Sequence, residues 1–168
     1  MTYARFEDIP AWQEAIRLAE GVYDMTESKG WSGSRSLQDQ LERAALSVSN
    51  NIAEGFERGT MNELLAFLYI ARGSAGEVRS MLCFLERRPR FVHLKSQISN
   101  LKSTAESCSR QLRGWADYLQ NSEIKGQRHL NDQSRRHYDA AKTAEESERE
   151  LLERLPPDHP LRKRSRQP

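Results

Sequence analysis

Residue patterns typical of acid–base, nucleophilic or metal sites are scarce in this 168-residue chain. It has four histidines and two cysteines, but no Glu-x-x-His pair and no glycine-rich phosphate loop. His93 has no Cys, His or carboxylate at ligand spacing, and Cys83 and Cys108 do not make a disulfide framework or a metal site. We therefore expect no enzymatic activity, no metal and no cofactor. The cysteines are predicted to be buried free thiols rather than a redox pair.

Clustered basic side chains indicate a different chemistry, the binding of phosphate groups. One cluster lies at a predicted turn and the other near the end of the sequence: Arg87, Arg88, Arg90 and Lys95, then Arg162, Lys163, Arg164 and Arg166. Arg87 and Arg88 would equally suit the dipole at the carboxyl end of a helix. The second cluster would equally suit a solvated chain end. Nucleic-acid binding is the functional interpretation of both.

Four helices must position these residues, because apolar residues recur at steps of three and four along four segments. The segments are 9–23, 37–56, 61–85 and 94–119. Asp8 is the expected N-cap of the first helix, Ser36 with Asp39 of the second, and Thr60 with Glu63 of the third. Short loops between long amphipathic helices favour antiparallel neighbours. The sequence therefore predicts an all-α fold, an up-down-up-down antiparallel four-helix bundle.

The third helix has more apolar surface than one side of a bundle needs. Beside its main stripe runs a second one, formed by Phe67, Ile70, Met81 and Phe84. This width argues against a long two-stranded coiled coil, which has a narrow seam. Two interpretations remain: the second stripe is an interface in a homo-oligomer, or the helix is central within its own bundle.

Polar and small residues interrupt the second and third helices. Asn51, Glu54 and Arg58 share one helix face, and Ser74 and Glu77 lie near the second apolar stripe. They form either a hydrogen-bonded polar layer that fixes helix register, or a surface for a ligand or partner. Both interpretations stay open.

Composition divides the chain at about residue 120. Residues 1–120 contain 52 apolar residues and equal numbers of basic and acidic ones, 15 of each, whereas residues 121–168 contain only 10 apolar residues. We expect a bundle domain over 1–120 and a polar, partly helical or disordered tail over 121–168. No apolar run is long enough to cross a membrane and no signal peptide is evident, so a cytoplasmic location is expected.

Three segments in order resemble a known family. Residues 6–15, 49–56 and 67–77 are similar to the bacterial four-helix-bundle proteins known as 23S rRNA-intervening-sequence proteins, over about residues 5–120. The resemblance implies a homopentameric barrel with a central channel. It also implies kinship with the accessory variability determinant of diversity-generating retroelements, a basic pentamer that binds nucleic acid and partners a reverse transcriptase. The neutral bundle and the long tail depart from this pattern.

Two functional hypotheses follow. The first is a non-enzymatic, oligomeric nucleic-acid-binding protein, with RNA the expected ligand and DNA the alternative. The second is a protein-interaction scaffold or accessory subunit, for example of a retroelement reverse transcriptase, which the neutral charge of the bundle favours.

Overall fold

The computed structural model describes residues 3–122 and, further on, residues 140, 143–144, 146–147, 149–152 and 154. Four long helices account for most of the first stretch: α1 Pro10–Thr26, α2 Arg35–Glu57, α3 Met61–Glu86 and α4 Lys95–Gln120. Short 3-10 helices, η1 Phe6–Asp8 and η2 Pro89–Leu94, precede α1 and α4. The described residues contain no strand. The predicted all-α fold is confirmed.

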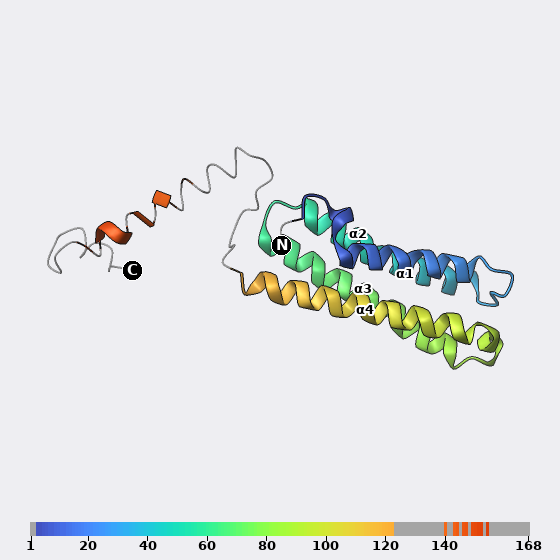
Figure 1. Ribbon diagram of the computed structural model, residues 1–168. Helices are drawn as coiled ribbons and strands as arrows, with labels where there is room; N and C mark the ends of the chain where they lie inside the picture. The colour runs from blue at the N-terminus through green and yellow to red at the C-terminus, as the bar shows by residue number, and fades with distance from the viewer. Residues whose placement is uncertain are drawn as a thin grey trace. The chain divides into compact units, whose positions relative to one another are not determined.

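The four helices form an antiparallel bundle in which each helix packs against two neighbours. α1 lies against α2 and α4, and α3 lies against the same two helices (Figure 1). The α1–α2 loop and the α3–α4 turn consequently meet at one end of the bundle (Figure 1). The N-terminal segment, the α2–α3 turn and the end of α4 lie at the other end. This is the predicted up-down-up-down order.

The core of the bundle confirms the predicted stripe of α3 in full. Its eight buried side chains are Met61, Leu64, Leu68, Ala71, Ala75, Val78, Leu82 and Leu85. In α4 the predicted stripe is also buried, except that Trp115 is only partly covered and Ala116 is buried in its place. Their regular three–four spacing therefore corresponds to one continuous apolar interior.

The predicted stripe of α1 is confirmed at Ile9 and Ala19, but its other three positions are each displaced by one residue. Trp12, Ile16 and Tyr23 are only partly buried, and the buried face consists of Ala11, Ala15, Leu18, Ala19, Val22 and Met25. Small side chains on that face let α1 approach its neighbours closely. At Gly21, an added Cβ would lie 2.7 Å from Leu101 Cδ2 of α4. Close packing thus moves the bulky aromatic residues to the edges of the α1 interface.

Helix starts show which capping predictions hold. Thr60 caps α3 as predicted, accepting the Glu63 backbone N–H at 3.2 Å and donating its hydroxyl to the Glu63 carboxylate at 2.8 Å. The prediction for α2 is wrong, because its N-cap is Ser34, whose Oγ accepts the Leu37 N–H at 3.3 Å. Asp8 is not the cap of α1 either. It lies in η1, and Ile9 precedes Pro10 without a side-chain cap.

The chain divides into two compact units, Met1–Gln127 and Arg128–Pro168. In the second unit all described residues are helical. There Arg154 forms an i,i+4 ion pair with Glu150 at 3.7 Å, and Leu151 is 55% exposed. No helix among the described residues is long and apolar enough to span a membrane.

Candidate nucleic-acid interface

The α3–α4 turn is held in place by two buried apolar anchors. α3 ends at Glu86, and the backbone N–H groups of Arg88 and Phe91 then close tight turns onto the carbonyls of Leu85 and Arg88. Pro89 cannot donate a backbone hydrogen bond, which suits the first residue of η2. Phe91 is 1% exposed and Leu94 9% exposed. All four predicted basic residues of this turn, Arg87, Arg88, Arg90 and Lys95, are exposed around these anchors.

The α1–α2 loop is joined to this turn by three contacts. The His93 Nε2–H donates to the carbonyl oxygen of Gly30 at 2.7 Å, and the Ser32 hydroxyl donates to the carbonyl oxygen of Arg90 at 3.3 Å. The rings of Trp31 and Phe91 lie 5.2 Å apart between their centroids. These contacts bring two further exposed cations, Lys29 and Arg35, to the same end of the bundle.

We call this surface the basic end; it comprises residues 27–35 and 86–95. It contains six Lys and Arg residues against two acids, Glu27 and Glu86, in a bundle whose residues 1–120 are neutral overall. Within the described residues, none of these six cations forms an ion pair. The zero net charge of the bundle therefore conceals an uneven distribution, with a net charge of about four at this end.

The surroundings of Glu86 reduce the effect of its negative charge. Its carboxylate accepts a hydrogen bond from Lys102 Nζ at 2.7 Å. This bond holds the pKa of Glu86 below its usual value, and the charges of Lys102, Lys95 and Arg87 act in the same direction. The same hydrogen bond, donated by Lys102, raises the pKa of Lys102. Glu86 is thus ionised and paired, and the other cations stay available.

Two arginines of the basic end are oriented by aromatic rings. The Arg88 guanidinium carbon lies 5.7 Å from the centroid of Phe84, and that of Arg90 lies 5.3 Å from the centroid of Phe91. Stacking fixes the plane of a guanidinium while its N–H groups remain free to donate. Such groups can form bidentate hydrogen bonds with phosphate oxygens.

Residues of the predicted polar layer lie at three separate levels of the α2–α3 seam. Nearest the α2–α3 turn, Arg58 pairs with Glu54 at 2.6 Å and lies 3.7 Å from Glu63. In the middle, the Ser47 and Ser74 hydroxyls are 3.0 Å apart. There the Asn51 amide donates to the carbonyl and hydroxyl oxygens of Ser47 at 2.6 and 2.9 Å. At the far level, Gln40 donates to Glu77 at 3.3 Å. Each pair satisfies its own groups, so the structure brings together no single ligand site from these residues.

The four predicted interface residues fall into two pairs. Phe67 and Met81 are partly buried; Met81 packs on the core of its own chain, and Phe67 lies beneath the Arg58 guanidinium at 5.1 Å. Ile70 and Phe84 are 51% and 49% exposed on the outer face of α3. The homo-oligomer interpretation therefore rests on Ile70 and Phe84.

Three glycines of α2 and α3 have different surroundings: Gly55 lies where the two helices pack together, whereas Gly73 and Gly76 lie on the exposed side of α3. At Gly55 of α2, a Cβ would lie 2.6 Å from the Cβ of Phe67, so this glycine is explained by close helix packing. At Gly73 and Gly76 of α3, nothing lies within 4 Å of the corresponding position. No contact among the described residues explains these two helix-weakening residues. Together with Ile70 and Phe84 they form what we call the outer face of α3.

The comparison with known families covers this whole architecture. A family model described as 23S rRNA-intervening sequence protein matches residues 7–114, from η1 through most of α4. The chain belongs to the 23S rRNA-intervening sequence protein family. No curated protein matches the chain. The matched residues thus include the basic end, the α2–α3 seam and the outer face of α3.

The remaining predicted basic residues are not part of this family match. Arg162, Lys163, Arg164 and Arg166 lie beyond residue 114 and outside the described residues. Lys29 and Arg35 lie inside the match, but local clustering does not predict them, because each stands apart from other basic residues in the sequence. The antiparallel topology was the available signal, since it places both loops at one end.

Both cysteines are free and lie within the bundle. Cys108 is buried, and burial raises the pKa of its thiol to about 12. Cys83 is half-buried and also free. Among the described residues, no three His, Cys, Asp or Glu side chains could together hold a metal ion.

Proposed function

We propose that this family member is a non-enzymatic, oligomeric protein that binds nucleic acid, RNA in particular, through its basic end. The observation that carries the proposal is the gathering of six cations, none in an ion pair among the described residues, at one end of a bundle whose residues 1–120 carry no net charge. Phosphate contacts supply most of the affinity in non-specific nucleic-acid binding, and they need exposed cations that no protein carboxylate already neutralises.

The stacked arginines make this surface better suited to phosphate than a flexible lysine cluster. Arg88 and Arg90 are held by Phe84 and Phe91, so less side-chain entropy is lost on binding. The two loops are also tied together through His93, which keeps cations from separate segments close to one another. We infer a backbone-binding surface that recognises nucleic-acid shape rather than a base sequence.

We further propose that copies of the chain assemble through the outer face of α3. Ile70 and Phe84 are half-exposed, and Gly73 and Gly76 leave room for a second backbone to approach. Exposed apolar residues beside small ones are typical of helix–helix contacts. A homopentamer is the assembly expected from the family resemblance. Several basic ends in one particle would raise the apparent affinity for a polyanion.

A gel-retardation titration with a structured RNA tests the nucleic-acid proposal. We would compare the full chain with the triple variant R87Q/R88Q/R90Q, which removes three charges from the basic end. The matched control is R43Q/R110Q/R113Q, which removes three exposed arginines elsewhere on the bundle. The proposal expects RNA binding at low salt that only the first variant weakens strongly. Absence of retardation at low salt, or equal losses in both variants, would contradict it.

The second candidate function is an accessory subunit that binds a protein, such as a reverse transcriptase. The exposed outer face of α3 favours this candidate as well. Association of a purified reverse transcriptase with the chain that survives nuclease treatment and is lost in Ile70→Asp would select it. Loss of association after nuclease treatment would select RNA binding.

A further inference from the structure

A pocket with a volume of about 380 Å³ lies at the end of the bundle opposite the basic end. It is formed between the N-terminal segment, the first turn of α1 and the last turns of α4. The buried side chains of Ile9 and Ala11 contribute to its apolar lining. Both its size and its composition are typical of sites for small molecules.

Three aromatic rings line this pocket. Tyr3 and Trp115 are 6.4 Å apart between ring centroids and almost perpendicular, at 85°. Tyr118 contributes a third ring and is 57% exposed. Because Tyr3 and Trp115 are nearly perpendicular, their ring faces are turned in two different directions, and Tyr118 adds a third ring to the lining. This is the arrangement that attracts alkylated ammonium ions through cation–π interactions.

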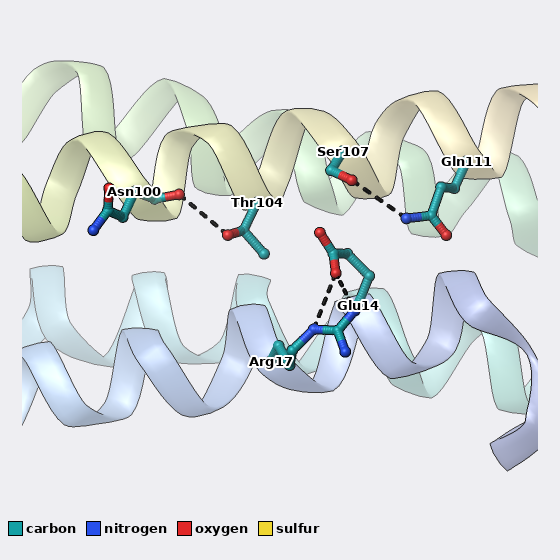
Figure 2. Close-up of polar contacts among 6 residues, drawn as sticks. All are labelled: Glu14, Arg17, Asn100, Thr104, Ser107 and Gln111. Carbon is teal, nitrogen blue, oxygen red and sulfur yellow. Dashed lines mark hydrogen bonds and ion pairs between the residues drawn. The ribbon is translucent and has the colours of Figure 1, made fainter.

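One amide gives the pocket a polar group with a defined direction. The Gln111 Nε2–H donates to the Ser107 hydroxyl at 3.3 Å. Figure 2 shows that the amide nitrogen points along α4 to Ser107 and that the amide oxygen points toward α1. The orientation of Gln111 therefore offers the pocket an acceptor, which suits a ligand carrying an N–H group.

The charges around the pocket favour a cation over an anion. Arg5 is paired with Glu7 at 2.6 Å, and Arg113 lies 3.6 Å from Asp117. The three segments at this end, residues 3–14, 53–63 and 110–122, contain four arginines against seven acids. A negatively charged ligand would find no unpaired arginine among these residues, whereas a cation enters a region of net negative charge.

We propose that this pocket binds a small protonated alkylamine, with its methyl groups among the rings of Tyr3, Trp115 and Tyr118 and its N–H donated to the Gln111 amide oxygen. The site is independent of the basic end and of RNA. An organic cation at this end would be a ligand of the bundle in its own right.

A pair of isosteric probes tests the charge requirement. Protonated dimethylethanolamine and 3-methyl-1-butanol have the same shape, but only the amine is charged and carries an N–H. Each is titrated into the full chain while the indole N–H resonance of Trp115, assigned with Trp115→Phe, is followed by NMR. The amine is expected to bind at least about tenfold more tightly than the alcohol.

Two variants and a control locate the binding. Tyr118→Ala is expected to weaken amine binding about tenfold, and Gln111→Leu to weaken binding of the amine but not of the alcohol. Tyr69→Ala, which removes a ring of similar exposure on α3, should leave the affinity unchanged. Circular dichroism confirms that each variant is folded. Equal affinity for amine and alcohol, or no shift of the Trp115 resonance at tens of millimolar amine, would overturn the proposal.

Discussion

The Nε2 atom of His93 lies 2.7 Å from the carbonyl oxygen of Gly30 and joins two loops that are 63 residues apart in sequence. A carbonyl can only accept, so the ring nitrogen carries the hydrogen. At Gly30 a Cβ would lie only 3.1 Å from this nitrogen, so the absence of a side chain allows the close approach. This contact holds Lys29 beside the α3–α4 turn.

Replacing His93 tests the role of this contact. His93→Ala should lower the free energy of unfolding by about 1 kcal/mol, since one hydrogen bond is lost at an exposed position. It should also weaken RNA binding several-fold, because the loop carrying Lys29 is no longer fixed. His93→Gln, whose amide can donate to the same carbonyl, should lose less of both. Urea denaturation and gel retardation measure the effects, and identical behaviour of the two variants would refute the assignment.

Salt dependence gives a second measure of the basic end. Each phosphate contact contributes about 0.7 to 0.9 to the slope of log affinity against log salt concentration. R87Q/R88Q/R90Q should therefore reduce this slope by roughly 2 to 3 when all three arginines contact phosphates. The slope of R43Q/R110Q/R113Q should equal that of the unmodified chain. An unchanged slope in the first variant would show that these arginines do not contact phosphates.

How far the fold could be predicted depends on how the apolar residues are distributed. In α3 six of the eight buried residues are large and only Ala71 and Ala75 are small, so the spacing of its main stripe predicts the buried face. In α1 the buried face includes three alanines, and the bulky Trp12, Ile16 and Tyr23 lie at its edges. A pattern of large residues therefore indicated a face rotated by one position. Interhelix distance, which decides where small residues are needed, is not encoded in one helix alone.

The polar layer shows the same limit at the candidate site. Spacing predicts that Asn51, Glu54 and Arg58 share one face of α2, and Arg58 of that face lies 3.7 Å from Glu63 of α3. It does not say which residue of α3 each one meets. In an antiparallel pair, residues equally distant from the turn face each other, so Arg58 meets Glu63 while Ser47 meets Ser74. Five residues interpreted as one layer are consequently spread along two helices.

The cap of α3 predicts a local stability effect. Thr60→Ala removes the hydroxyl that accepts the Glu63 N–H and should cost about 1 kcal/mol of unfolding free energy. Ser34→Ala should have a similar effect on α2. Ser36→Ala is the control, because Ser36 lies inside α2 and its replacement should change stability little. Chemical denaturation measures the unfolding free energies of the three variants, and a large loss of stability in Ser36→Ala would contradict the cap assignment.

The outer face of α3 predicts the effect of a single charge on assembly. Ile70→Asp introduces a carboxylate beside Gly73 and should convert the expected oligomer to monomers, because burying an unpaired charge is costly. Val92→Asp is the matched control: Val92 is 70% exposed in η2, away from that face. Sedimentation velocity at micromolar concentration distinguishes them. A monomeric unmodified chain, or an oligomer that survives Ile70→Asp, would exclude this interface.

The buried thiol of Cys108 predicts how stability changes in alkaline solution. Burial raises the pKa of Cys108 from 9.0 to about 12, so between these pH values the folded state holds a proton that the unfolded state releases. The unfolded state then binds fewer protons, and the free energy of unfolding falls as pH rises. The contribution of the protonated Cys108 thiol to the free energy of unfolding is complete below pH 9.0 and is lost as the pH approaches 12.

Cys108→Ala isolates this contribution from the titration of other groups. The variant should be less stable than the unmodified chain at neutral pH, because it leaves a small cavity in the core. Its unfolding free energy should nevertheless fall less steeply above pH 9.0, since the thiol no longer ionises on unfolding. Cys83→Ala is the control, because Cys83 is only half-buried. Urea denaturation at several pH values measures the slopes, and parallel slopes for Cys108→Ala and the unmodified chain would show that the Cys108 thiol does not titrate as described.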